Sequence, residues 1–240
     1  KLEVQEKTLR DLASAAASAA PPARAKDVAD DFQNQIAAIG TANTGFAQAP
    51  AAVPAKPIKI VAFGDSLTAG LGLMGNEAFP VRLQKALESK GIKVDMINAG
   101  VSGDTASGGR DRLDWSIPEG TDAVILELGA NDALRGTDPA VTRAALTDIL
   151  TRLKARKIAV LLCGMMAPPN YGTDYADRFN AIYPELAKTF GVPLYAFFLD
   201  GVAADARLNQ KDGIHPTAEG VDAIVKNMLP TVEAFLGTIA

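Results

Sequence analysis

Two residue types that many metal sites and disulfide networks require are nearly absent from this 240-residue sequence, which has one cysteine and one histidine. A single cysteine cannot form an internal disulfide framework or a multi-cysteine metal cluster. The single histidine, His215, excludes a multi-histidine metal site, so any chemistry that needs an imidazole must use it. No run approaches the ~18–20 consecutive apolar residues that a membrane span requires. We therefore expect no integral membrane segment and no metal site.

A basic surface is missing as well. Lys and Arg number 24 against 28 Asp and Glu, which gives a net charge of −4 and a pI near 5.1. Nucleic-acid-binding proteins carry an excess of positive charge, so we expect no nucleic-acid partner. Apolar residues make up 48% of the chain and charged residues 22%, which is typical of an ordinary globular protein.

The first 56 residues differ in composition from the rest. Seventeen of them are alanine, and a Pro/Ala-rich tether at 49–57 closes the segment. Alanine-rich runs favour helix, but the apolar faces here are thin, so we predict a partly helical extension that is either flexible or a docking arm. The sequence Ala47-Gln48-Ala49 is similar to a signal-peptidase site. Residues 32–46 are too polar for the apolar core of a signal peptide, however, and we predict none in this chain.

From residue 57 onward, strand-like and helix-like segments alternate regularly. Apolar runs of strand length occur at 58–63, 92–98, 122–128, 158–163 and 192–197, and helix-length segments at 79–90, 139–157, 174–190 and 217–236. Nearly continuous apolar strands that alternate with helices predict a parallel sheet covered on both faces. We therefore predict one α/β domain over 57–240, a three-layer α/β/α sandwich with a five-stranded parallel sheet. Ligands of such sheets bind at the carboxyl ends of the strands.

Residues that can supply chemical groups follow several of these predicted strands. Ser66 follows the first strand, Gly103 the second and Asn131 the third, while Asp212 and His215 precede the last helix. A serine, a histidine, a carboxylate and spare hydrogen-bond donors are the components of acyl transfer.

A serine hydroxyl becomes an effective nucleophile only when a base removes its proton. Asp212 stands three residues before His215, so its carboxylate can bind one ring nitrogen while the other faces Ser66. The carboxylate would fix the tautomer and stabilise the imidazolium that forms during attack. The alternative is that Ser66 only caps a helix and that Asp212 and His215 only occupy a helix N-terminus, where an aspartate is favourable.

Attack on an acyl carbon also requires donors for the oxyanion. The backbone N–H groups of Ser66 and Gly103 and the side-chain amide of Asn131 can supply three. Gly103 and Asn131 are also common turn and cap residues, which is the structural alternative.

Four blocks carry a family resemblance: Gly64-Asp65-Ser66-Leu67, Gly103, Gly129-Ala130-Asn131-Asp132 and Asp212-Gly213-Ile214-His215. The sequence resembles the SGNH (GDSL) hydrolase superfamily, and the segments 102–105, 134–136, 170–172 and 212–216 resemble its bacterial thioesterase I, lysophospholipase and arylesterase subgroup. The resemblance covers 58 to about 235. It implies a flavodoxin-like fold, a reaction without a cofactor, and a periplasmic or secreted location. It also implies that Ser66 is the nucleophile, His215 the base and Asp212 the acid that orients it. The implied oxyanion donors are Ser66, Gly103 and Asn131. Ala130 replaces a glycine of close relatives, and residues 1–56 lie outside the resemblance.

A competing motif is the literal G-x-G-x-x-G at residues 70–75, with Asp95 twenty residues beyond Gly75. A dinucleotide-binding turn needs its first glycine directly after the first strand. Here Ser66 occupies that turn, so these glycines predict a mobile loop beside the active site instead.

The sequence thus predicts a serine hydrolase that cleaves carboxylic esters and thioesters with an apolar acyl or aryl group. Candidate substrate-binding residues come from the loops around the site: Leu71, Leu73, Met74, Leu134, Ala167 and Tyr171. Two alternatives remain, a carbohydrate O-acetylesterase with the same catalytic residues and a non-enzymatic α/β binding module. A homo-oligomer is left open.

Overall fold

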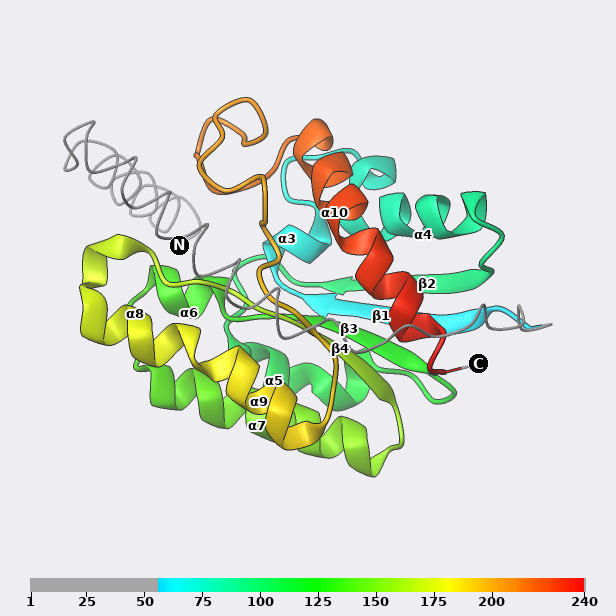
Figure 1. Cartoon of the computed structure of the whole chain (residues 1–240), viewed down its shortest axis with the longest axis horizontal. Coiled ribbons are helices and arrows are strands. Elements are labelled where there is room, and N and C mark those ends of the chain that lie inside the picture. The colour runs from blue at the N-terminus through cyan, green and yellow to red at the C-terminus, as the bar shows by residue number, and fades with distance from the viewer. Residues whose placement is uncertain (1–55, 240) are drawn as a thin grey trace.

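The computed structural model describes residues 56–239. The predicted extension, its tether and the signal-peptidase-like site therefore lie outside the described residues, apart from the tether's last two positions. The described part is built on one five-stranded parallel sheet in the order β2-β1-β3-β4-β5, which confirms the predicted sheet (Figure 1). Its strands are β1 (Ile58–Gly64), β2 (Val94–Gly100), β3 (Ala123–Glu127), β4 (Ala159–Cys163) and β5 (Leu194–Tyr195).

Helices cover both faces of the sheet, as predicted for a three-layer α/β/α fold. One face carries α3 (Ser66–Ala69), α4 (Phe79–Ser89) and α10 (Ala218–Leu236). The other face carries α5 (Ala106–Ser116), α7 (Pro139–Ala155), α8 (Thr173–Asn180) and α9 (Ile182–Phe190). Three shorter elements lie in the connections: η2 (Gly75–Glu77), α6 (Ala130–Leu134) and η3 (Pro169–Tyr171).

The core lies on both sides of the three central strands. Side chains such as Ile60, Phe63, Leu126 and Leu161 are fully buried there. Each such side chain contributes about 1.5–3 kcal/mol by leaving water. The helix starts also follow their sequence signals, since the Asp138 side chain accepts a hydrogen bond from the backbone N–H of Ala140 at the start of α7.

Two predicted strands differ from the structure by more than one residue at their ends. The second strand begins at Val94 rather than at residue 92, because the Ile92 N–H donates to the Leu87 carbonyl and closes the turn after α4. The fifth strand keeps only two paired residues.

Among the helices of eight or more residues, the structure differs from prediction in two places. Helix α5 was not predicted, because its sequence contains Gly108 and Gly109 and lacks an apolar face. The single helix predicted over 174–190 is two helices that meet at Ala181. Pro184 lacks the backbone N–H that would continue the first helix through this point.

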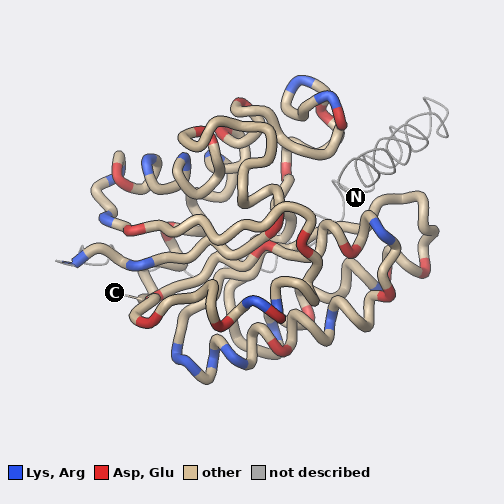
Figure 2. The backbone as a smooth tube through the Cα atoms, turned by 180° about the vertical axis from the view of Figure 1, so that it is seen from behind, with Lys and Arg blue, Asp and Glu red and all other residues tan. Residues whose placement is uncertain are grey.

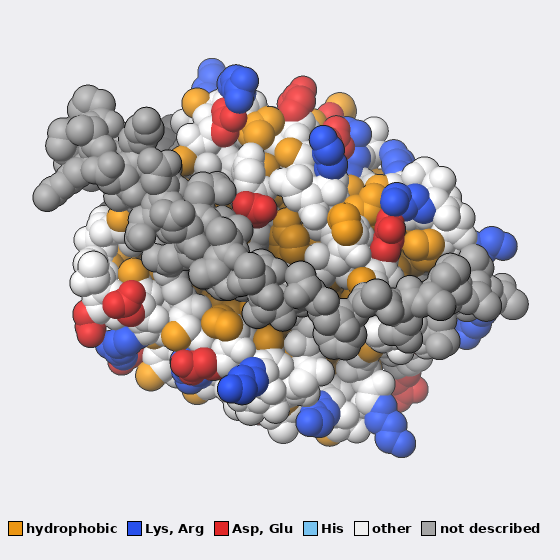
Figure 3. All heavy atoms as spheres, viewed as in Figure 1, with side chains coloured by type: hydrophobic (Ala, Val, Ile, Leu, Met, Phe, Trp, Pro, Cys, Tyr) orange, Lys and Arg blue, Asp and Glu red, His pale blue; other side chains and the backbone are white. Residues whose placement is uncertain are grey.

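The parallel arrangement brings all the carboxyl ends of the strands to one edge, and the long connection from 196 to 217 returns over this edge before α10 (Figure 1). Several acidic residues gather where the strands end (Figure 2). On the visible part of the face in Figure 3, hydrophobic side chains form small groups among charged ones. Within residues 56–239, no helix is long and apolar enough to cross a membrane.

Candidate active site

Ser66 is the first residue of α3, directly beyond the end of β1. Its side chain is almost completely buried, and the Asp65 carboxylate before it accepts a hydrogen bond from the Leu67 N–H at 3.0 Å. Gly64 has no room for a side chain, because a Cβ there would overlap the Thr68 hydroxyl and the Glu127 carboxylate. The chain can therefore turn this closely against β3 only with glycine at position 64.

The structure brings the three predicted triad residues together although Ser66 and His215 are 149 positions apart. His215 Nε2 lies 2.9 Å from Ser66 Oγ, and His215 Nδ1 lies 2.7 Å from Asp212 Oδ2. The second carboxylate oxygen, Oδ1, accepts hydrogen bonds from the N–H groups of Ile214 and His215 at 2.9 and 3.0 Å. One carboxylate thus shapes the loop and orients the imidazole that it contains.

Burial opposes the ionisation of Asp212, but the Ile214 N–H, the His215 ring and the His215 N–H together hold the pKa of this carboxyl below its ordinary value. Asp212 therefore carries its negative charge at neutral pH. A carboxylate in this position stabilises a positive imidazolium and keeps the Nε2 lone pair directed at the serine.

Three hydrogen-bond donors remain available beside the serine. Within residues 56–239, the backbone N–H groups of Ser66 and Gly103 donate to no other protein group. Asn131 Nδ2 donates one hydrogen to Asp65 Oδ2 at 3.0 Å, which leaves its second hydrogen free. Gly103 has φ = +83°, a conformation that favours glycine, and its carbonyl accepts a hydrogen bond from Arg135 Nη2 at 2.9 Å.

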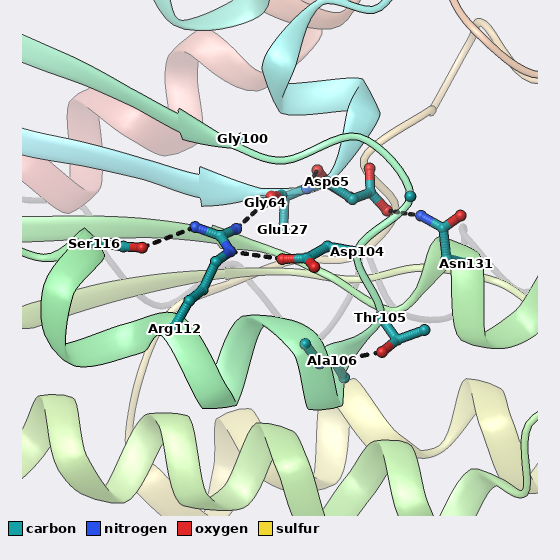
Figure 4. A network of polar contacts seen from close by, with 12 residues as sticks. Gly64, Asp65, Gly100, Asp104, Thr105, Ala106, Arg112, Ser116, Glu127 and Asn131 are labelled. Atoms are coloured by element: carbon teal, nitrogen blue, oxygen red, sulfur yellow. Dashed lines mark hydrogen bonds and ion pairs between the residues drawn. The ribbon is translucent and has the colours of Figure 1, made fainter. Parts of the chain in front are cut away.

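Sequence reasoning missed the buried arginine that supports this edge. The Arg112 guanidinium on α5 forms an ion pair with Asp104 at 2.6 Å and donates to the Gly64 carbonyl at 2.8 Å (Figure 4). It also lies 4.1 Å from the centroid of the Phe63 ring. Arg112 thus links the end of β1 to the turn that contains Gly103. No local pattern marks an arginine inside a helix as buried, so only the spatial arrangement reveals it.

Two tyrosines hold the segment that contains Asn131, a role that was not predicted for either, although Tyr171 was a candidate substrate-binding residue. The hydroxyls of Tyr171 and Tyr183 donate to the carbonyls of Leu134 and Leu128, each at 2.9 Å. The available signal was the aromatic spacing, because Tyr171, Tyr175, Phe179 and Tyr183 recur every four positions. Their rings contact one another in turn from η3 through α8 to α9.

The candidate substrate-binding residues occupy different environments. Leu71 is 45% exposed and Met74 66% exposed, whereas Leu73 packs partly against the core. Leu134 and Tyr171 are half-buried and joined by the hydrogen bond just described. Ala167 is buried at 3% exposure.

The Leu71 carbonyl accepts a hydrogen bond from Gln210 Nε2 at 2.7 Å, and the Gln210 N–H donates to the His215 carbonyl. The loop at 70–75 is therefore tied to the loop of His215. It follows α3 rather than β1, which is not the position of a dinucleotide-binding turn.

A hollow of about 820 Å³ lies on the surface between α7 and the α8–α9 pair, bounded by residues such as Arg143, Thr147 and Asp177. No triad residue lines it. This hollow is therefore separate from the edge that carries the predicted triad.

Residues 62–223 match the GDSL-like lipase/acylhydrolase family. The chain belongs to this family. Esterase TesA of Pseudomonas aeruginosa is 37% identical over 178 residues, which cover 74% of this chain and 89% of that protein. Thioesterase 1/protease 1/lysophospholipase L1 of Escherichia coli is 38% identical, with coverage of 72% and 84%.

The crystal structure of AlinE4, a SGNH-hydrolase family esterase, is similar at 47% identity and a TM-score of 0.64, covering 75% of this chain and 96% of that chain. The fold and the family resemblance predicted from the sequence are thus confirmed, and the chain is a serine hydrolase of carboxylic esters.

Proposed function

We propose that this chain hydrolyses carboxylic esters and thioesters through an acyl-enzyme on Ser66, with His215 as base and Asp212 as its orienting acid. The continuous hydrogen-bonded chain from Ser66 Oγ to His215 and on to Asp212, at 2.9 and 2.7 Å, carries this proposal. These distances lie within the range over which a base removes a serine proton.

The reaction proceeds in two acyl-transfer steps. Ser66 Oγ attacks the acyl carbon while its proton moves to His215 Nε2. The tetrahedral intermediate then expels the alcohol or thiol, whose oxygen or sulfur receives this proton, and the acyl group stays on the serine. A water molecule next gives its proton to Nε2 and attacks the acyl-enzyme. The proton finally returns to Ser66 Oγ as the carboxylic acid leaves.

The Ser66 and Gly103 N–H groups and the free hydrogen of Asn131 Nδ2 stabilise the negative oxygen of both tetrahedral intermediates. Support comes from their availability: the two backbone groups have no acceptor within residues 56–239, and Asp65 holds the Asn131 amide in one orientation. Donors fixed before the reaction need no reorganisation when the charge develops.

The substrate carries an apolar acyl or aryl group. Leu71 and Met74 expose apolar surface on the loop that is tied to the His215 loop through Gln210. The named relatives, an esterase and a thioesterase/lysophospholipase, support ester and thioester leaving groups. A periplasmic or secreted location, which the family resemblance implies, is part of this proposal.

The test is covalent labelling of Ser66 with an alkyl phosphonate ester, followed by mass spectrometry of the intact chain and its peptides. We expect one phosphonyl group per chain on Ser66, loss of esterase activity in parallel, and neither effect with Ser66→Ala. A panel of nitrophenyl esters, acyl thioesters and acetylated sugars then separates an apolar acyl preference from O-acetylesterase activity. A folded wild-type protein that is neither labelled nor active on any of them would contradict the proposal and favour a binding module.

A further inference from the structure

A buried carboxyl group that the mechanism does not use lies beneath the nucleophile. Glu127 is the last residue of β3 and pairs in register with Gly64 of β1. Its side chain has no exposure to solvent. One of its oxygens, Oε2, accepts hydrogen bonds from the Asp65 N–H at 3.2 Å and from the Thr68 hydroxyl at 2.7 Å. Glu127 therefore contacts the residue directly before Ser66 and the residue two positions after it.

The surroundings of Glu127 favour a neutral acid. Burial and the nearby Asp65 carboxyl raise the pKa of Glu127 well above its ordinary value. Among residues 56–239, no cation forms an ion pair with it, and its other oxygen, Oε1, has no hydrogen-bond partner. The other titratable groups facing it are Cys163 on β4 and Tyr183 on α9, and burial raises the pKa of both. None of these neighbours supplies a positive charge.

The nearest buried guanidinium is engaged elsewhere. Arg112 directs its nitrogens to Asp104, Ser116 and the Gly64 carbonyl, as Figure 4 shows. A proton on Oε1 leaves Oε2 as a carbonyl oxygen that can accept both hydrogen bonds. The absence of a side chain at Gly64 brings the strand close enough for this contact.

We propose that Glu127 acts as a neutral acid that positions the nucleophile, by holding the backbone on one side of Ser66 and the Thr68 side chain on the other. The inference rests on the proposed role of Ser66. The same contact fixes the Asp65 backbone, and the Asp65 carboxylate binds the Asn131 amide. One buried acceptor thus supports the nucleophile directly and an oxyanion donor indirectly.

The role of Glu127 depends on an acceptor oxygen and not on a negative charge, and two substitutions separate these properties. Glu127→Gln keeps an oxygen at the position of Oε2, whereas Glu127→Leu has a similar size and no acceptor. We expect Leu to lower kcat about 10- to 100-fold, since small displacements of reacting groups have effects of this size, with KM within about twofold. Gln should keep kcat within about threefold.

The experiment measures kcat and KM on a soluble nitrophenyl ester together with the rate of Ser66 labelling by the phosphonate. Thr121→Val serves as the matched control. It also removes a largely buried threonine hydroxyl, which donates a hydrogen bond to the Pro118 carbonyl, but this residue lies before the start of β3, at the end opposite to Glu127. We expect the labelling rate to fall with kcat in Glu127→Leu and to stay unchanged in Thr121→Val. Circular dichroism and urea unfolding confirm that each variant is folded.

Where Glu127→Leu does not fold, Thr68→Val tests the second half of the contact. We expect a several-fold loss of kcat in Thr68→Val, an unchanged KM, and recovery of kcat in Thr68→Ser. A folded Glu127→Leu variant with wild-type kcat would overturn the inference. A Glu127→Gln variant with a kcat as low as that of Glu127→Leu would also overturn it, and so would a Thr68→Val variant with the same kcat as Thr121→Val. A wild-type protein without activity or labelling would instead refute the proposed function, so the two failures are distinguishable.

Discussion

Replacing Asp65 with asparagine should stabilise the protein at alkaline pH while it impairs catalysis. The Asp65 side chain is fully buried, and it accepts hydrogen bonds from the Leu67 N–H and from Asn131 Nδ2. Burial is the largest influence on this carboxyl and, despite those hydrogen bonds, raises the pKa of Asp65 from 3.8 to about 6. The folded protein therefore holds the Asp65 proton more tightly than the unfolded chain does.

The sign of the effect follows from this difference. An acid whose pKa is raised by folding opposes folding above that pKa, and the penalty disappears as the pH falls from about 6 toward 4. A shift of roughly 2 pKa units corresponds to about 3 kcal/mol at pH 8, at 1.36 kcal/mol per unit. Asparagine removes this penalty, but its neutral amide binds Asn131 less strongly than the ionised Asp65 carboxylate does, which costs about 1 kcal/mol. The net gain is about 2 kcal/mol at pH 8 and none at pH 4.

Catalysis should change in the opposite direction. An asparagine side chain at position 65 has one oxygen for two donors, the Leu67 N–H and Asn131 Nδ2. The backbone N–H is fixed, so the new amide nitrogen would face Asn131. Asn131 would then turn its own oxygen toward that nitrogen, and its Nδ2 would no longer lie at the oxyanion. We therefore expect kcat of Asp65→Asn to fall about 10²- to 10³-fold, the usual effect of losing one oxyanion donor.

Urea unfolding of wild type and Asp65→Asn at pH 8 and pH 4 measures the stability difference. Asp95→Asn on the exposed side of β2 provides the control for a carboxylate that is not buried. A variant that is less stable than wild type at pH 8, or that differs from it equally at both pH values, would refute the reasoning.

Three further predictions concern other parts of the chain. Asn131→Ala should lower kcat about 10²- to 10³-fold with KM nearly unchanged in steady-state assays, and a rise in KM alone would show that Asn131 binds the ground state instead. Deletion of 1–56 should keep hydrolysis of a small soluble ester within about threefold, because the described residues contain the triad and the core; a folded truncation with a more than tenfold loss of kcat would contradict this. Tyr183→Phe should cost about 1–2 kcal/mol in urea unfolding, because it leaves the buried Leu128 carbonyl unpaired. Tyr195→Phe should cost almost nothing, since the buried Tyr195 hydroxyl has no partner within residues 56–239, and equal losses in the two variants would argue against this reasoning.

Most of the fold could be predicted because its signals are local. The strands β1, β3 and β4 are short apolar runs, and α7 begins at an Asp-Pro pair that marks a helix start. Helix α5 escaped prediction because its stability comes from packing on α7 and from the buried Arg112, not from its own helix propensity.

The proposed catalytic residues could be predicted for a related reason. Ser66, Gly103 and Asn131 each follow a strand, and the carboxyl ends of parallel strands meet at one edge. Asp212 and His215 are three positions apart, so their contact is also nearly local.

The parallel α/β architecture, the family and the candidate triad could all be derived from the sequence, because each rests on short-range patterns and, for His215, on the only histidine of the chain. The hydrogen-bond partners and the burial of the side chains around the triad follow from the tertiary structure alone. Glu127 lies 62 positions from Asp65, and Arg112 lies 48 positions from Gly64. The charge that such a side chain carries depends on how completely the fold removes it from water and on which partner it meets there, and neither is encoded in its sequence neighbours.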